Sequence, residues 1–413
     1  MNGKIVAGWI LLFVGLPSLG EAAGQPTSNQ GLQGLQGYLD LAKGKRPNTG
    51  TQKFAGIALT RADAAKACEL LWADHLKFIR KERSPEMNAK VIRHGEFAMR
   101  FEFFVYGKLP KKGRSLFISM HGGGNAPARV NDSQWNNQKR LYRPKEGVYV
   151  APRAPTNTWD LWHQGHIDPL FSRLIENMVA TQNVNPNRVY LMGYSAGGDG
   201  VYQVAPRMAG CFAAAAMMAG HPNETSPLGL RNLPFAIHVG ERDSGFNRNK
   251  VALQWKDKLA TLNETDPQGY AHYVRIHAGR GHWMNREDAV AVEWMAKHVR
   301  NPFPRKIIWK QDNVAHNSFY WLSLPEGQAK AREEIRARIK GQVIDLWGPV
   351  GKKVEVNLND DLVDLQKPVV ISSQGKELFK GEIARTIGQL ADSLVRRRDR
   401  EYMFPSQITV TLP

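Results

Sequence analysis

Val189-Tyr190-Leu191-Met192-Gly193-Tyr194-Ser195-Ala196-Gly197-Gly198 is an apolar stretch with strand character that ends in Gly-x-Ser-x-Gly. Asn185-Pro186-Asn187 supplies a turn before it, and residues 196–208 can continue as a helix. A buried strand that turns sharply into a helix needs small residues where the backbones crowd, and it lifts the serine above the edge of a sheet. The pattern makes Ser195 a candidate nucleophile, with a small residue in a tight turn as the alternative.

A second glycine-rich turn follows a strand earlier in the chain. The apolar run 115–120 leads into His121-Gly122-Gly123-Gly124-Asn125. Acyl transfer creates an oxyanion that is best stabilised by backbone N–H groups already in place, and glycines let the backbone approach a substrate. We expect an oxyanion hole formed by the N–H of Ala196 with that of Gly123 or Gly124. A phosphate-binding loop is the rival interpretation, but neither Gly-x-x-x-x-Gly-Lys nor Gly-x-Gly-x-x-Gly occurs here.

Two further strands end in residues suited to an acid and a base. The strand 233–240 precedes Asp243, whose carboxylate can orient an imidazole. The strand 273–277 precedes a glycine-rich turn and His282, which can accept the serine proton and return it to the leaving group. Rival acids are Asp199 and Glu241, and the rival base is His277; Asp243 and His282 are favoured because they lie beyond their strands.

The chain order Ser195, Asp243, His282 is that of an α/β hydrolase. Over residues 85–300 the sequence resembles that superfamily. The Gly-Tyr-Ser-Ala-Gly-Gly elbow is most similar to secreted polyhydroxybutyrate-depolymerase-like, feruloyl and acetylxylan esterases, and to prolyl-oligopeptidase catalytic domains. The resemblance implies an α/β-hydrolase fold, mostly parallel with helices on both faces, with these three residues as nucleophile, orienter and base.

The resemblance leaves the substrate class open. Asn125-Ala126-Pro127 stands where many such enzymes carry an aromatic residue. Peptidase relatives usually carry a large β-propeller before the catalytic domain, and the segment before residue 85 is too short for one. This favours an ester as the substrate over a peptide.

Aromatic residues lie near these strand ends, where loops of open α/β sheets line binding sites. We expect a substrate pocket lined by Trp159, Trp162, His163, Tyr194 and Trp283, with core packing as the alternative for the first two. No cysteine or carboxylate cluster joins the histidines to complete a metal site, so we expect no metal and no organic cofactor.

Composition shifts divide the chain. Lys4 precedes an apolar run and a small-residue cleavage site, which predicts a signal peptide over 1–22 and a secreted or periplasmic protein. Residues 23–55 are rich in Gly, Gln and Asn, and we expect a flexible lead-in there. An α/β-hydrolase catalytic domain over 56–304 is followed by a small antiparallel β-sandwich-like domain over 305–413 with one helix. That last domain either holds a polymeric substrate or only packs against the first.

The chain has 413 residues, a formal charge of +18 and two cysteines, Cys68 and Cys211. Two cysteines cannot form a disulfide framework; they either form one bridge or stay as buried free thiols. The positive charge would attract anionic cell-surface polymers. Because the basic residues are scattered and no nucleic-acid motif accompanies them, we do not expect nucleic acid to be a partner.

The sequence thus predicts a secreted serine hydrolase that cleaves carboxylic esters, small or polymeric, through an acyl-enzyme. A peptidase of prolyl-oligopeptidase type and an inactive polymer- or surface-binding protein are the alternatives. The pattern does not indicate an oligomeric state.

Overall fold

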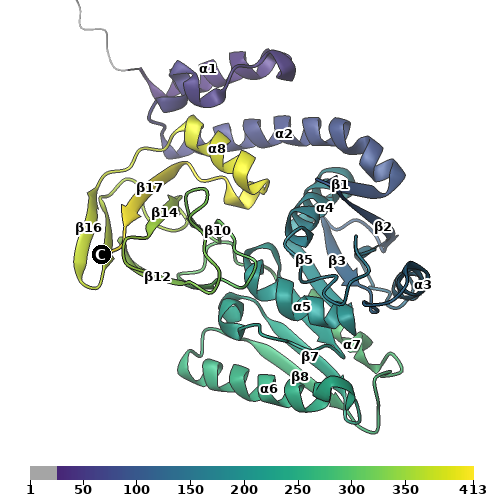
Figure 1. Cartoon of the computed structure of the whole chain (residues 1–413). Helices are drawn as coiled ribbons and strands as arrows, with labels where there is room; N and C mark the ends of the chain where they lie inside the picture. The colour runs from purple at the N-terminus through teal and green to yellow at the C-terminus, as the bar shows by residue number, and fades with distance from the viewer. Residues whose placement is uncertain (1–25) are drawn as a thin grey trace, which may run out of the picture.

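The computed structural model describes residues 26–413 as an α/β domain, a β-rich C-terminal domain and a pair of N-terminal helices (Figure 1). The predicted signal peptide, 1–22, lies outside the described residues. Among residues 26–413 no helix is both long enough and apolar enough to span a bilayer. Both cysteines are free thiols, so the predicted alternative of a bridge between them is not realised.

An eight-stranded sheet forms the α/β domain, in the order β1-β2-β4-β3-β5-β6-β7-β8. The first two strands form an antiparallel hairpin, and β2 joins β4 in antiparallel fashion, whereas all later neighbours are parallel. Buried parallel strands need apolar residues on both faces, and β4, β6 and β7 are buried throughout. The strands are β1 Val91–His94, β2 Phe97–Tyr106, β3 Arg114–Met120, β4 Gly147–Pro152, β5 Val184–Tyr194, β6 Ala214–Met218, β7 Phe235–Gly240 and β8 His272–His277.

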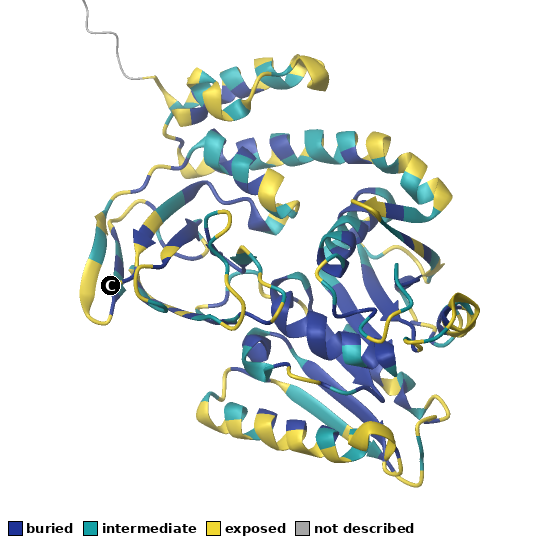
Figure 2. Cartoon of the chain, viewed as in Figure 1, coloured by how far each residue is buried: buried dark blue, intermediate teal, exposed yellow. Residues whose placement is uncertain are grey.

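Helices cover both faces of this sheet, as the sequence predicts. Figure 2 shows β5 and α5 as largely buried, with the outer side of α6 exposed. Two separate apolar clusters lie on the two faces, one beneath α4, α5 and α6 and the other beneath α3 and α7. The helices are α3 Ala128–Gln138, α4 Ile167–Gln182, α5 Ala196–Arg207, α6 Arg248–Thr265 and α7 Val290–Ala296.

The predicted flexible lead-in over 23–55 is wrong for the residues the structure describes. Helix α1, Ser28–Asp40, is followed by short 3₁₀ turns that run up to Gly56. Its first turn is held by a capping box in which the Thr27 side chain accepts from the Gln30 backbone and the Gln30 side chain accepts from the Thr27 backbone. Reciprocal capping offsets the weak helix propensity of its glycines.

Helix α1 is also fixed by its packing partners. Leu32 and Leu35 are buried on the face of α1 that packs on α2 (Arg61–Ala89), in an apolar cluster that also holds residues of α8 (Ile387–Arg397). In Figure 1, α1 lies over α2, and α8 lies beneath α2. Composition alone did not predict this order, because it does not show that α1 packs on α2 and on the 3₁₀ turn Lys53–Gly56.

The C-terminal domain consists of two sheets, in the orders β10-β11-β14-β17 and β16-β15-β13-β12-β9. The predicted antiparallel pairing holds except between β13 and β15, which are parallel. The chain passes through the other sheet between these two strands, so no hairpin constrains their relative direction. The strands are β9 Lys306–Lys310, β10 Ser318–Phe319, β11 Leu322–Ser323, β12 Glu334–Lys340, β13 Val343–Trp347, β14 Lys353–Leu358, β15 Val369–Ser373, β16 Lys376–Gly381 and β17 Ser406–Thr411.

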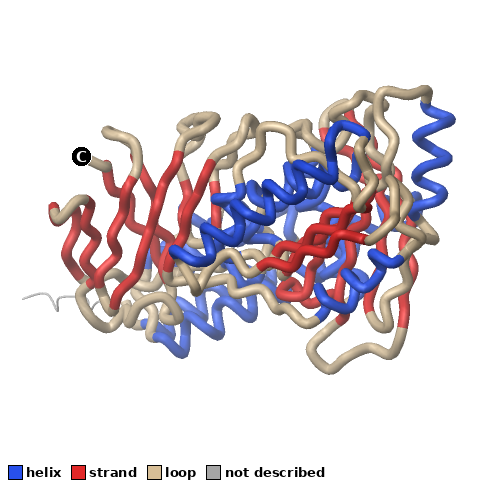
Figure 3. The backbone as a smooth tube through the Cα atoms, turned by 90° about the horizontal axis from the view of Figure 1, so that it is seen from below, coloured by secondary structure: helices blue, strands red, loops and turns tan. Residues whose placement is uncertain are grey.

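The two domains share one apolar core and several buried ion pairs. The cluster beneath α4, α5 and α6 continues into the C-terminal sheets. Asp168 on α4 pairs with Arg207 at 2.6 Å and with His316 of the C-terminal domain at 2.5 Å. Seen from below in Figure 3, the C-terminal strands lie at one end of the molecule and the strands of the α/β domain lie towards the other. The shared core indicates that the domains form one unit.

The turn from β5 to α5 is tightly packed. A Cβ on Gly193 would lie 2.2 Å from the Gly197 carbonyl oxygen, and a Cβ on Gly197 would lie 2.1 Å from that of Met120. Real Cβ atoms do not approach that closely. Ser195 between them has φ 58° and ψ −122°, and its N–H donates to the Met218 carbonyl at 2.9 Å. The elbow glycines are therefore required by backbone contact.

Replacing Gly193 with Ala should lower the free energy of unfolding by about 2 kcal/mol or more, because an added methyl group in a packed turn forces the backbone apart. Urea unfolding measures the change. Gly37→Ala on α1 is the matched control: its Cβ would meet nothing within 4 Å, and alanine should stabilise the helix by up to about 1 kcal/mol. Equal stability of the Gly193→Ala variant and the wild type would contradict the contact argument.

Candidate active site

The structure brings the three predicted side chains together at the carboxyl edge of the sheet. Nε2 of His282 lies 2.9 Å from Oγ of Ser195, and its Nδ1 lies 2.9 Å from Oδ2 of Asp243. Asp243 is buried, whereas Ser195 is partly open and the His282 side chain is 44% exposed. A substrate can therefore reach the serine and the imidazole, while the carboxylate is shielded from water.

The loops that carry the acid and the base are bonded to each other. The Arg242 N–H donates to the Arg280 carbonyl, and the Glu241 N–H donates to the His277 carbonyl. The Glu241 carboxylate accepts from the Gly279 N–H at 2.7 Å. Glu241, which the sequence left as a rival acid, thus shapes the loop that precedes His282.

The other two rivals have different partners. Asp199 accepts from the His221 N–H at 2.6 Å, and burial raises its pKa to about 6. His277 contacts His238 and Glu287. The structure thus brings only Asp243 of the candidate acids, and only His282 of the candidate bases, to the serine.

Tyr194 holds the base loop from the strand side. Its hydroxyl donates to the His282 carbonyl at 2.7 Å and accepts from the Met284 N–H at 3.0 Å. Because Tyr194 directly precedes Ser195, its side chain ties Ser195 to the loop of His282.

The glycine loop after β3 runs past the serine. A Cβ on Gly122 would lie 3.1 Å from that of Ser195, so backbone replaces side chain at this point. The Gly124 N–H donates to Oδ1 of Asn131 at 2.8 Å. In the described part of the chain the Gly123 N–H has no such partner. Of the two alternatives left open by the sequence, the geometry favours Gly123, with Ala196 at the first turn of α5, where N–H groups point out of the helix.

Buried polar groups hold this loop. His121 is buried and its pKa is lowered to about 3 by desolvation, so the ring is neutral. Its Nδ1 donates to the Gly122 carbonyl at 2.6 Å, and its Nε2 accepts from the Ala154 N–H at 3.1 Å. Nε1 of Trp162 donates to the His121 carbonyl at 2.9 Å. Asn131 also donates to the Ala126 carbonyl, so both sides of the turn are fixed.

The predicted pocket residues separate into two groups. Tyr194 and Trp283 line an open cavity of about 770 Å³ beside Ser195, together with Val130, Leu141 and Arg286. Trp162 and His163 are buried outside it, and Trp159, at the loop surface, is not among its lining residues. Trp162 is wrong as a pocket wall because its ring fills space against Gly200, where no side chain stands, and its N–H is directed at the glycine loop.

Sequence reasoning missed Asn131 and Arg286. Asn131 lies on α3, a segment without a clear amphipathic pattern, and nothing in its neighbourhood indicates a role at a loop. The structure gathers no set of three or more His, Cys, Asp or Glu side chains suited to a metal anywhere in residues 26–413.

Comparisons with known proteins bear on the α/β domain. Residues 146–301, less than half of the chain, match the Dienelactone hydrolase family. This match, the strand order and the serine turn decide the architecture. The eight-stranded domain has the α/β-hydrolase fold. The resemblance and fold class that the sequence predicts are confirmed.

Named relatives of this α/β-hydrolase domain include a bifunctional acetylxylan esterase/xylanase, XynS20E of Neocallimastix patriciarum, which is 33% identical over 141 residues. That match covers 33% of this chain, and the chain spans only about a fifth (20%) of the relative's length. Among solved structures, a thermostable esterase has a TM-score of 0.39 at 19% identity, covering 51% of this chain and 62% of that one. A poly(3-hydroxybutyrate) depolymerase, LpqC of Bordetella parapertussis, has a TM-score of 0.38 at 16% identity, covering 51% and 87%.

His121 should make stability depend on pH. The folded protein binds the proton only near pH 3, whereas an unfolded histidine binds it near pH 6.5, so acid favours the unfolded chain between these values. In a His121→Gln variant that contribution is absent. The stability advantage of the wild type over the variant should shrink by up to about 1.4 kcal/mol per pH unit as the pH falls through this window.

Urea unfolding at several pH values measures this difference. His94→Gln, at an exposed histidine on β1, is the control for general effects of histidine removal. If the wild type and the His121→Gln variant lose stability in parallel, His121 is not buried in its neutral form.

Proposed function

We propose that this protein is a serine hydrolase that cleaves carboxylic esters through an acyl-enzyme. The observation that carries the proposal is the continuous hydrogen-bonded line from Asp243 through His282 to Ser195, with 2.9 Å at both steps. The match to the Dienelactone hydrolase family and the esterase names of the relatives support it.

Each group has one task in this reaction. Oγ of Ser195 attacks the ester carbonyl while Nε2 of His282 takes its proton, and Asp243 stabilises the imidazolium that forms. The N–H groups of Ala196 and Gly123 bind the oxyanion. His282 then protonates the departing alcohol, and the same groups activate water to release the acid from the acyl-enzyme.

The cavity beside Ser195 bears on the substrate. About 770 Å³ is far more than an acetyl group needs, so a bulky alcohol or acyl group fits as well. Trp283, which is 52% exposed at the cavity, offers an aromatic face to a sugar or phenyl ring. We propose esters in which one side is such a ring, and acetylated xylan, suggested by the relative's name, is the first polymer to test.

We also propose that the protein is exported. The basic residue Lys4, the apolar run that follows it and the small residues near Ala22 support removal of a signal peptide. N-terminal sequencing of the protein recovered outside the cytoplasm tests this, and an intact Met1 on that material would contradict cleavage.

Ser195→Ala and Asp243→Asn should each lower kcat on p-nitrophenyl esters by about 10⁴-fold. The first variant lacks the nucleophile, and the second lacks the carboxylate that orients His282. Acetate, butyrate and longer esters, compared side by side, measure the acyl limit of the cavity. Ser84→Ala, at an exposed serine on α2, is the matched control and should keep full activity.

Three outcomes would count against the proposal. Full turnover by the Ser195→Ala variant would require another nucleophile. Cleavage of a prolyl anilide in preference to every ester would favour a peptidase. A wild type that is inert towards esters and fluorophosphonates would favour a binding protein.

A further inference from the structure

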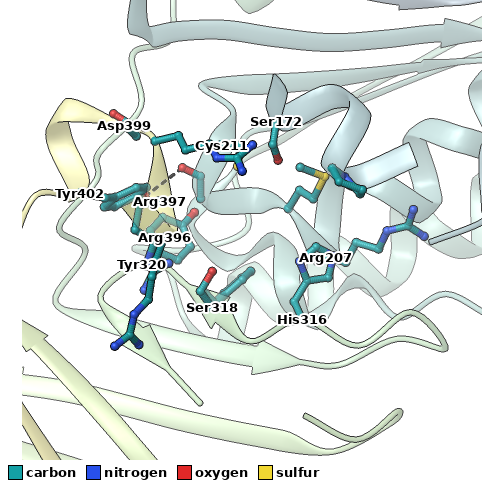
Figure 4. A pocket seen from close by; sticks show the side chains of 15 residues that line it. Ser172, Arg207, Cys211, His316, Ser318, Tyr320, Arg396, Arg397, Asp399 and Tyr402 are labelled. Atoms are coloured by element: carbon teal, nitrogen blue, oxygen red, sulfur yellow. Dashed lines mark hydrogen bonds between the residues drawn. The ribbon is translucent and has the colours of Figure 1, made fainter. Parts of the chain in front are cut away.

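A second cavity, of about 280 Å³, lies between the two domains (Figure 4). Its walls come from α4, from the end of α5 with the 3₁₀ turn Ala209–Cys211, from β10 and from the end of α8. Ser195 stands before the first residue of α5 and this cavity lies at the last, about 18 Å away for a helix of 12 residues. The cavity is therefore separate from the candidate active site.

The lining is strongly basic. Its arginines are Arg207, Arg396, Arg397 and Arg398, and its one carboxylate is Asp399. Three of these charges are already matched: Arg207 pairs with Asp168, Arg396 with Glu355 and Asp392, and Asp399 with Arg300. In the described part of the chain no carboxylate lies within ion-pair distance of Arg397 or Arg398. A net positive charge is thus left facing the cavity.

Arg397 is fixed by hydrogen bonds from one of its nitrogens, and its other N–H groups remain free. Its Nη2 donates to the Leu322 carbonyl at 2.8 Å and to Oγ of Ser323 at 3.0 Å. Its guanidinium lies 5.7 Å from the ring centre of Tyr402. Nε and Nη1 make no hydrogen bond to any described residue. Burial lowers the pKa of Arg397 to about 10, so its surroundings do not compensate its charge.

Two neutral hydroxyl groups line the cavity beside the Arg397 guanidinium. Tyr320 lines the cavity and is 2% exposed, yet its hydroxyl has no hydrogen-bond partner in residues 26–413. Ser318, also in the lining, likewise has a hydroxyl without a partner there. The hydroxyl of a residue as buried as Tyr320 is normally hydrogen-bonded, whereas Ser318 is only half-buried. A free tyrosine hydroxyl beside a guanidinium that lacks a carboxylate partner indicates a missing acceptor.

The position of the arginines has a partial structural explanation. The carboxyl end of α8 favours cations, which accounts for arginines in its last turn. It does not account for the free Nε and Nη1 of Arg397 or for the buried hydroxyl of Tyr320. Each of these groups has a proton to donate, and the guanidinium N–H groups cannot accept a hydrogen bond.

We propose that this interdomain cavity binds a small molecule that carries a carboxylate or phosphate group. Arg397 binds the anionic oxygens through its planar pair of donors, and Tyr320 and Ser318 add hydrogen bonds. The cavity volume limits the ligand to about the size of one acidic sugar or one small phosphate ester.

Isothermal titration calorimetry of the full chain tests this site, with inorganic phosphate and D-glucuronate as the anionic probes and D-glucose as the neutral control. Ionic strength is kept constant with sodium chloride. The wild type should bind at least one of the anions and not glucose, and Arg397→Gln should weaken that binding about tenfold or more. A preference between the probes identifies the anionic group.

Control variants distinguish binding in this cavity from non-specific attraction of anions to a positively charged protein. Arg338→Gln removes an exposed arginine of β12, whose side chain is 56% exposed, and should bind as the wild type does. Tyr320→Phe removes a single donor and should weaken binding several-fold without changing the charge; it keeps the test open if Arg397→Gln does not fold. Ser195→Ala should bind the anion normally, so failure of the esterase proposal would not affect this result.

Binding of neither anion to the wild type at millimolar concentration would overturn the proposal. Equal binding by the wild type and by both the Arg397→Gln and Tyr320→Phe variants would also overturn it. Folding of each variant is checked by its unfolding transition in urea.

Discussion

The strained backbone at Ser195 is the constraint on which the rest of the α/β domain depends. A non-glycine residue at φ 58° and ψ −122° lies in a sparsely populated region and costs about 1–3 kcal/mol. It persists because the Ser195 N–H is bonded to β6 and because α5 lies against β3 and β5 without intervening side chains. The same contacts aim Oγ out of the sheet and leave the N–H groups of the first turn of α5 free.

Buried polar side chains then fix the loops around that serine. The neutral His121, the Trp162 indole and the Asn131 amide hold the glycine loop, and the Tyr194 hydroxyl holds the loop of His282. These hydrogen bonds hold each loop in one conformation. Any other conformation would leave a buried polar group without a partner, at a cost of about 1–3 kcal/mol. The N–H groups that we propose as oxyanion donors are thereby held in place before any substrate arrives.

The sequence predicted what depends on local pattern. Ser195, Asp243 and His282 each follow an apolar strand, and the carboxyl ends of parallel strands meet at one edge, so their convergence could be inferred. Contacts between residues that lie far apart in the sequence could not be inferred in this way. Trp162 donates to a carbonyl 41 residues earlier in the chain, a bond that no sequence pattern shows, so the sequence predicts a pocket wall there instead. The order of α1 depends on its packing against α2, which composition does not show.

The proposed function requires a covalent acyl-enzyme on Ser195. Acid quenching of the wild type during turnover of a p-nitrophenyl ester, followed by peptide mass spectrometry, measures this directly. We expect an acyl group on the peptide that contains Ser195, and none in a sample given the free acid in place of the ester. Steady turnover with an acyl group on a different residue would contradict it.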